Sequence, residues 1–103
     1  MNIIDTPPGR ESAGHERTRF ELWGSPCVVS LGVRLLSSLA QRDLYVAHAE
    51  LDLLEADCLL VMRNIQEISQ ATDYGDEYIA DRVGNIQGAI ARARSANGCV
   101  VIW

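Results

Sequence analysis

Three side chains near the middle of the chain have the types and spacing of a metal site. His48, Asp52 and Glu55 are separated by four and three residues, so on a helix they would share one face. Imidazole and carboxylate groups bind divalent metals. A di-iron bundle, however, needs a Glu-x-x-His motif on two helices, and the only other histidine is His15. A solvated helix face is therefore the preferred interpretation; a metal-binding helical assembly is a lower-ranked alternative, and no cofactor is expected.

The three cysteines show neither a disulfide framework nor a zinc pattern. Cys27, Cys58 and Cys99 are far apart, whereas zinc sites use close pairs such as C-x-x-C. We expect buried, reduced thiols. The sequence also has no Ser-His-Asp or Cys-His context, no phosphate-binding loop and no aromatic–basic platform. These absences predict that the protein is not an enzyme.

Negative charge is the clearest chemical signal in the sequence. Residues 43–81 contain ten acidic residues and one basic residue, Arg63, within a chain of net charge −5. Such a segment repels phosphate groups, so direct binding to nucleic acid or to an anionic membrane is disfavoured. A basic protein is the kind of partner that this charge favours.

The acids of residues 43–57 fall within an apolar run. In a heptad numbering, Asp43, Glu50 and Asp57 form one row between two apolar rows, which a simple amphipathic helix does not show. One interpretation is internal: burial of both apolar rows and pairing of the acids with arginines such as Arg82, Arg92 and Arg94. The other is a recognition surface, because mutually repelling acids without a local benefit are typical of one. The predicted partner-binding residues are Glu50, Asp52, Glu55, Asp57, Asp73, Asp76 and Glu77.

Two helices must position these acids. The sequence has neither Gly nor Pro between Val33 and Tyr74, and apolar residues spaced by three and four predict a helix over 43–71. Its seam consists of Leu44, Ala47, Leu51, Leu54, Cys58, Val61, Ile65 and Ile68. A second helix is predicted over 75–95, with the seam Ile79, Val83, Ile86, Ile90 and Ala93. The short intervening loop makes the two helices antiparallel neighbours.

The remaining segments predict a small sheet and several turns. "RFELW" (19–23) and "CVVIW" (99–103) are candidate strands that would pair with each other. Residues 27–31 are ambiguous between strand and helix, because Ser25 and Pro26 could begin a helix. Gly84 and Gly88 suggest close backbone approach, with tolerated glycines on an exposed face as the alternative. Gly98 is expected to end the second helix in the left-handed conformation.

Together these patterns predict an α+β, helix-dominated fold. It would be an antiparallel helical hairpin, with a third helix as an option, and a small antiparallel sheet formed by the N-terminal and C-terminal segments. Residues 1–18 are expected to be an irregular N-terminal segment, and residues 19–103 a single compact domain. No apolar run is long enough to span a bilayer, and the start lacks a signal-peptide pattern, so a cytoplasmic location is expected.

The predicted function is that of a small acidic inhibitor. Immunity proteins and antitoxins that cap the basic face of a nucleic-acid-binding protein, or of a toxin nuclease, share this profile of small size and acidity. The comparison concerns this class of protein only, because the chain matches no family's motif. The main alternative is a homo-oligomeric structural or adaptor module built from the helical hairpin. The sequence identifies neither the partner nor the stoichiometry.

Overall fold

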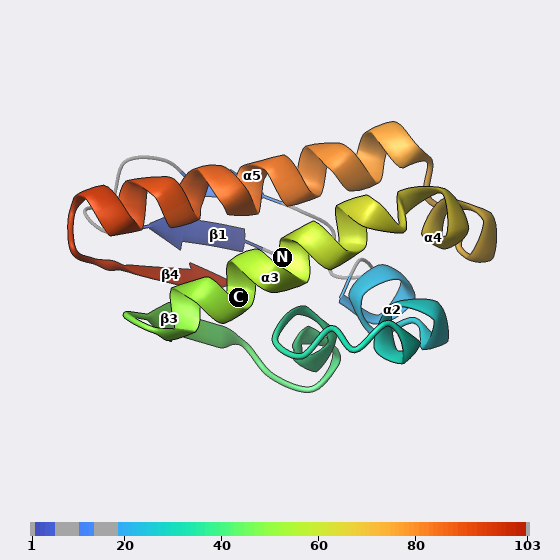
Figure 1. Ribbon diagram of the computed structural model, residues 1–103, viewed down its shortest axis with the longest axis horizontal. Coiled ribbons are helices and arrows are strands. Elements are labelled where there is room, and N and C mark those ends of the chain that lie inside the picture. Colours follow the sequence, from blue (N-terminus) through green and yellow to red (C-terminus); the bar gives the residue numbers. More distant parts are fainter. Residues whose placement is uncertain (1, 6–10, 14–18, 103) are drawn as a thin grey trace.

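The computed structural model in Figure 1 has an α+β architecture dominated by helices, as the sequence predicts. It describes residues 2–5, 11–13 and 19–102, with side chains described over 21–102. In chain order the elements are β1 (Asn2–Asp5), β2 (Glu11–Ala13), the π-helical turn η1 (Arg19–Trp23), α2 (Pro26–Ser30), the 3₁₀ helix η2 (Leu36–Ala40), β3 (Leu44–Ala47), α3 (Glu50–Arg63), α4 (Ile65–Ala71), α5 (Asp76–Ser95) and β4 (Cys99–Ile102).

The sheet has four antiparallel strands in the order β2-β1-β4-β3. The C-terminal strand β4 lies in the interior of this order, with β1 on one side and β3 on the other. In this register Ile102 pairs with Ile3 of β1 and with Leu44 of β3. The N-terminal and C-terminal segments thus contribute to one sheet, as predicted.

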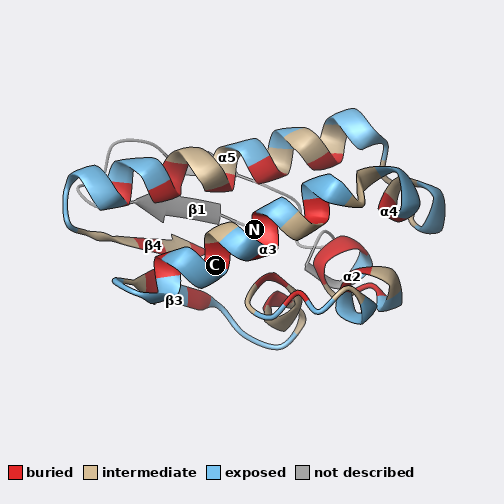
Figure 2. Ribbon diagram, viewed as in Figure 1, coloured by how far each residue is buried: buried red, intermediate tan, exposed pale blue. Residues whose placement is uncertain are grey.

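Helices α3 and α5 lie side by side and pack on this sheet. α5 contacts β1 and β4, while α3 contacts β3 and α5. The two helices run antiparallel, so the C-terminal end of α5 lies beside the N-terminal end of α3 (Figure 1). Figure 2 shows that the buried positions of both helices face inward. The buried core includes the predicted seam residues Leu51, Leu54, Cys58, Val61, Ile68, Ile79, Val83, Ile86, Ile90 and Ala93.

The predicted single helix over 43–71 is wrong in two places. Residues 44–47 form β3, in which Leu44 and Val46 are buried while Tyr45 is exposed, the two-residue alternation of a strand. His48 then turns the chain with a φ of 54° before α3 begins. A second break at Asn64 separates α3 from α4. Leu44 and Ala47 fit the apolar spacing of the helix that follows, but residues 44–47 form a strand because they pair with β4.

The N-terminal predictions also need correction. Residues 19–23 form the π-helical turn η1 instead of a strand, so β4 pairs with β1 and β3. The segment expected to be irregular, 1–18, contains β1 and β2 over its described residues. Residues 27–31 take the helical alternative: Ser25 is the N-cap of α2, Pro26 is at its first turn, and the Ser25 hydroxyl accepts a hydrogen bond from the Val28 N–H.

The glycines of α5 and its C-terminus differ from expectation. An added Cβ at Gly84 would meet nothing within 4 Å, and one at Gly88 would meet only the Arg92 side chain. The predicted close backbone approach is therefore wrong. At the helix end, Asn97 adopts the left-handed conformation with a φ of 53°. The Gly98 N–H donates to the Ala93 carbonyl at 2.7 Å, which completes a Schellman motif one residue earlier than predicted.

Truncation of the core should test the packing of the two helices. Leu54→Ala and Ile86→Ala each empty a fully buried position. We expect each to lower the free energy of unfolding by about 2–5 kcal/mol, measured by urea titration. Val29→Ala on α2 is the matched control, because Val29 is 52% exposed, and we expect a change within about 0.5 kcal/mol. Equal effects at all three positions would contradict the seam assignment.

Candidate functional site

Asp57 is a buried carboxylate that joins α3 to a distant loop. Its residue exposure is 3%. Oδ1 accepts a hydrogen bond from the Arg34 N–H at 3.1 Å, and Oδ2 accepts from the N–H groups of Leu35 and Leu36 at 2.7 and 3.0 Å. These donors precede or begin η2, where backbone N–H groups have no partner within the helix. Asp57 therefore caps η2 from a position more than twenty residues away in sequence.

This geometry overturns the prediction that Asp57 contacts a partner. Its two oxygens are directed at the backbone of residues 34–36 and are shielded from solvent. Asp57 lies on the side of α3 that also carries the buried Leu54 and Val61. The internal interpretation of the acidic row is thus correct for Asp57, although its donors are backbone groups and not arginines.

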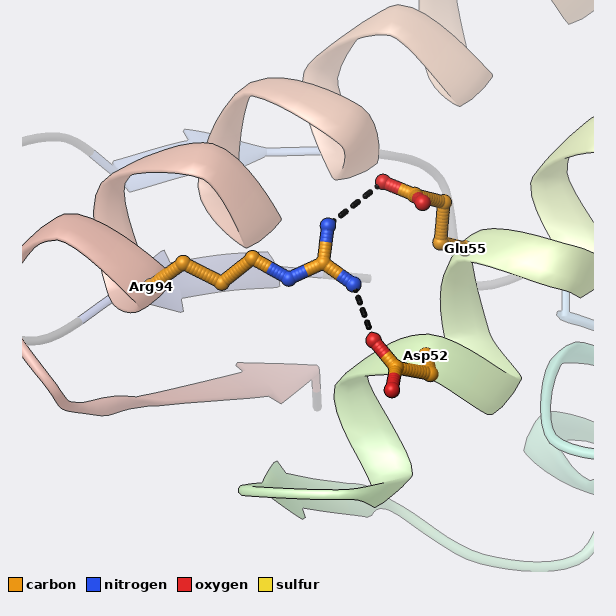
Figure 3. Close-up of polar contacts among 3 residues, drawn as sticks. All are labelled: Asp52, Glu55 and Arg94. Carbon is orange, nitrogen blue, oxygen red and sulfur yellow. Dashed lines mark hydrogen bonds and ion pairs between the residues drawn. The ribbon is translucent and has the colours of Figure 1, made fainter.

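Asp52 and Glu55 are bridged by an arginine from α5. Figure 3 shows the Arg94 side chain reaching across to both carboxylates. Its Nη1 lies 2.7 Å from Glu55 Oε2, and its Nη2 lies 2.5 Å from Asp52 Oδ1. The hydrogen bond to Glu55 first, and that to Asp52 second, raise the pKa of Arg94. Arg94 is one of the three arginines that the sequence proposed as internal partners. Its single positive charge offsets half of the charge of these two acids within the molecule.

The other predicted acids lie at the opposite end of the molecule. Asp73, Asp76 and Glu77 are exposed at the corner where α4 turns into α5. Asp76 Oδ1 accepts from the Glu77 N–H at 2.8 Å, and its Oδ2 accepts from Gln66 Nε2 at 3.3 Å, which ties the start of α5 to α4. Glu50 is exposed in the first turn of α3, at the far end from this corner (Figure 1). The predicted residues therefore do not form one continuous surface.

Sequence reasoning missed several residues of this corner. Glu67 on α4 and Asp81 on α5 are also exposed carboxylates, and residues 64–81 contain no Lys or Arg. Tyr74 and Tyr78 stack with ring centroids 5.0 Å apart, and the Tyr74 hydroxyl donates to Glu21 Oε2 at 3.3 Å. The four-residue spacing of the tyrosines was visible in the sequence. Glu21 gave no signal, because 53 residues separate it from Tyr74. We name Glu67, Asp73, Asp76, Glu77 and Asp81 the acidic corner.

The acidic corner already shows one way in which a cation can be held. The Arg82 guanidinium lies over the Tyr78 ring, 5.1 Å from its centroid, and Arg82 also pairs with Asp81 at 3.9 Å. A ring face attracts a guanidinium through the ring quadrupole. Aromatic rings beside carboxylates are thus a suitable surface for arginine side chains.

Within residues 21–102, no group of three or more His, Cys, Asp or Glu side chains is arranged to hold a metal ion. Asp52 and Glu55 bind Arg94, and His48 lies outside α3 in the preceding turn. The face predicted from the spacing of these three residues therefore does not form. Among the described helices, none is long and apolar enough to cross a bilayer.

The three cysteines are free thiols, as predicted, but only one of them is buried. Cys58 lies on the buried side of α3, while Cys27 and Cys99 are half-buried. Burial first, and the nearby charges of Asp57 and Glu55 second, raise the pKa of Cys58 to about 12. The hydrogen bond and charge of Cys99 raise the pKa of the exposed Tyr45. Cys58 is therefore a core residue and not a nucleophile.

Comparison with known proteins gives no relative: no family model, curated protein or solved structure matches this chain.

Removal of the Asp57 carboxylate should strongly destabilise the fold. In Asp57→Ala three backbone N–H groups lose their acceptor. We expect a loss of about 2–5 kcal/mol, since each unsatisfied buried donor costs about 1–3 kcal/mol. Glu67→Ala, at an exposed position on α4, should stay within about 0.5 kcal/mol. Urea unfolding of both variants makes the comparison, and an Asp57→Ala variant as stable as Glu67→Ala would contradict the capping role.

The Cys58 thiol should make stability fall in alkaline solution. Its pKa is about 12 in the folded protein and about 8.5 in an unfolded chain, so the folded state binds the proton more tightly. Stability is therefore complete below about pH 8.5 and decreases as the pH rises toward 12, with a loss of about 2 kcal/mol by pH 10. Urea titrations at pH 8 and 10 measure this loss.

Cys58→Ala is the control for that measurement, because it removes the thiol but leaves the other groups that titrate in the same range. We expect its stability to fall less between pH 8 and 10 than that of the unsubstituted protein. An identical fall in both proteins would show that Cys58 does not cause the pH dependence.

Proposed function

We propose that this protein is a small acidic binding protein that acts by capping a basic surface of another protein. The observation that supports this is the acidic corner: five exposed carboxylates beside a stacked tyrosine pair, with no Lys or Arg in residues 64–81. Carboxylates there provide long-range attraction, and the tyrosines provide ring faces for guanidinium groups. In this proposal binding, not catalysis, is the activity.

The proposed partner is a nucleic-acid-binding protein or a nuclease, because such proteins present clustered Arg and Lys side chains to phosphates. An acidic corner that occupies this cluster would compete directly with the nucleic acid. The role would be that of an immunity protein or antitoxin, carried out in the cytoplasm. The corner replaces the larger set of residues proposed from sequence, because Asp57 is buried and Arg94 holds Asp52 and Glu55.

Part of this negative charge has a local role. Asp76 and Glu77 lie in the first turn of α5, where each would favour the helix dipole by about 0.3–1 kcal/mol. Glu67 also lies in the first turn of its helix, α4, whereas Asp73 is in the loop and Asp81 is beyond the first turn of α5. Asp81 pairs with Arg82 at 3.9 Å. Asp73 repels its neighbours without the benefit of a helix dipole, which fits a surface kept for recognition.

Calorimetric titration with an arginine-rich peptide tests the acidic corner directly. We expect binding by the unsubstituted protein that weakens as salt rises, and at least about tenfold weaker binding by the triple variant Glu67→Gln, Asp73→Asn, Glu77→Gln. The control is Asp43→Asn, Glu50→Gln, Glu55→Gln, which changes the net charge equally outside the corner. Equal weakening in both variants would mean that net charge, and not the corner, attracts the peptide.

The product of the adjacent gene provides the second probe where that product is basic. We expect binding by this protein to inhibit its nucleic-acid binding or cleavage, with the corner variant inhibiting less than the control variant. An adjacent basic protein that neither binds nor is inhibited, while the arginine-rich peptide binds normally, would contradict the inhibitor role and leave the cation-binding corner standing.

A further inference from the structure

The outward side of α3 is more apolar than that of an ordinary surface helix. Three of the five large exposed hydrophobic residues of the molecule's described part belong to it: Leu53, Leu59 and Met62, exposed by 44%, 50% and 36%. Ala56 is exposed beside them, and Leu60 is half-buried. Figure 2 shows this helix across the front of the molecule, with exposed positions along its length. Contiguous apolar surface of this kind marks an interaction site.

The outermost residues of α3 are spaced so that two copies of this helix, placed antiparallel, would fit each other. Asp52, Ala56, Leu59 and Arg63 follow one another at four, three and four residues, the spacing of a seam that packs against a second helix. The row begins with an acid and ends with a base. When an identical row is placed antiparallel to it, Asp52 lies opposite Arg63 and Ala56 lies opposite Leu59, twice each.

We infer that α3 pairs in antiparallel orientation with α3 of a second copy of this chain, about a twofold axis at the middle of the helix. Such an interface is isologous, since the same patch serves both copies. Ala56 allows close approach of the helices at the centre, and Leu59 of the other copy fills the space beside it. On one flank Leu53 lies next to Leu60 of the other copy, so the apolar row continues.

Charge identifies the second copy as the occupant of this face. Arg63 is the only basic residue in 43–81, and within residues 21–102 its side chain makes no hydrogen bond or ion pair. Its position on the rim of an apolar stripe, eleven residues from Asp52, is what an antiparallel copy requires. Asp52 keeps most of its side chain exposed, 78%, although it contacts Arg94, so it can accept a second cation. This interface is separate from the acidic corner and does not depend on it.

Sedimentation velocity on charge-reversed variants tests this pairing. The unsubstituted protein should shift from a species of 11.3 kDa toward twice that mass over roughly a hundredfold rise in concentration. Arg63→Glu and Asp52→Arg should each weaken the dimer at least about tenfold, because like charges then face each other twice. Arg42→Glu, an exposed reversal before β3, should leave dimerisation unchanged.

Mixing the two weakened variants provides the decisive result. In a mixed dimer of Arg63→Glu with Asp52→Arg, both facing positions carry opposite charges, so dimerisation should return; the double variant Asp52→Arg, Arg63→Glu should also dimerise with itself. Circular dichroism establishes that each variant is folded. A protein that is monomeric at every concentration would overturn the inference. A dimer insensitive to either reversal, or reversals not rescued by mixing, would overturn it equally.

Discussion

The fold depends on one buried carboxylate that is bound by backbone N–H groups from a distant segment. Burying a charge is costly unless hydrogen bonds compensate for its lost hydration. Asp57 meets this requirement with three N–H donors from residues 34–36. The contact therefore exists only when α3 is formed and the loop before η2 is in its native conformation. One interaction couples the helix to a segment that has little regular structure of its own.

This coupling also determines the path of the chain from η2 to the sheet. Fixing the start of η2 against α3 places Leu36 and Leu39 in the core, both fully buried. The chain then leaves η2 only a few residues before β3, which joins the edge of β4. The acid in the middle of the apolar run thus has a local benefit after all. Its neighbours Leu54 and Val61 exclude water, and Asp57 orients the element that packs on them.

The sequence allowed good prediction of the elements with strong periodicity and poor prediction of those defined by distant partners. α5 spans Asp76–Ser95, almost the predicted 75–95, because its five seam residues repeat without interruption. β3 was missed because Leu44 and Ala47 fit a helical period equally well, and only β4, more than fifty residues later, selects the strand. Residues 19–23 alternate like a strand, yet they form η1, which packs mainly against η2. Backbone N–H groups have no sequence signature, so the donors to Asp57 could not be predicted.

The number of acidic residues in 43–81 can be counted from the sequence, but their distribution over the folded molecule could not be predicted from it. The ten acids of 43–81 divide into the internal Asp57, two that Arg94 holds, five exposed at the α4–α5 corner, and Asp43 and Glu50, which are exposed outside the corner. The corner holds the largest exposed group of acids, and Arg82, which pairs with Asp81, is the only Lys or Arg in residues 64–91. Arg92 and Arg94, in the last turn of α5, return to the α3 end because α5 runs antiparallel. Of the arginines after residue 81, only Arg82 stays at the corner. An antiparallel hairpin thus converts a charge gradient along the chain into one between the two ends of the molecule.

The two proposed surfaces are compatible for the same geometrical reason. The molecule is 37 Å long, and the acidic corner lies at one end of it, whereas a twofold axis through the middle of α3 lies near its centre. Because the paired helices run antiparallel, the corners of the two copies point in opposite directions. A dimer would then present two separated acidic surfaces, and a partner with two suitably spaced basic patches would gain avidity without any new contact. A partner with a single basic patch would gain nothing from dimerisation, so the dimer itself would select between these two kinds of partner.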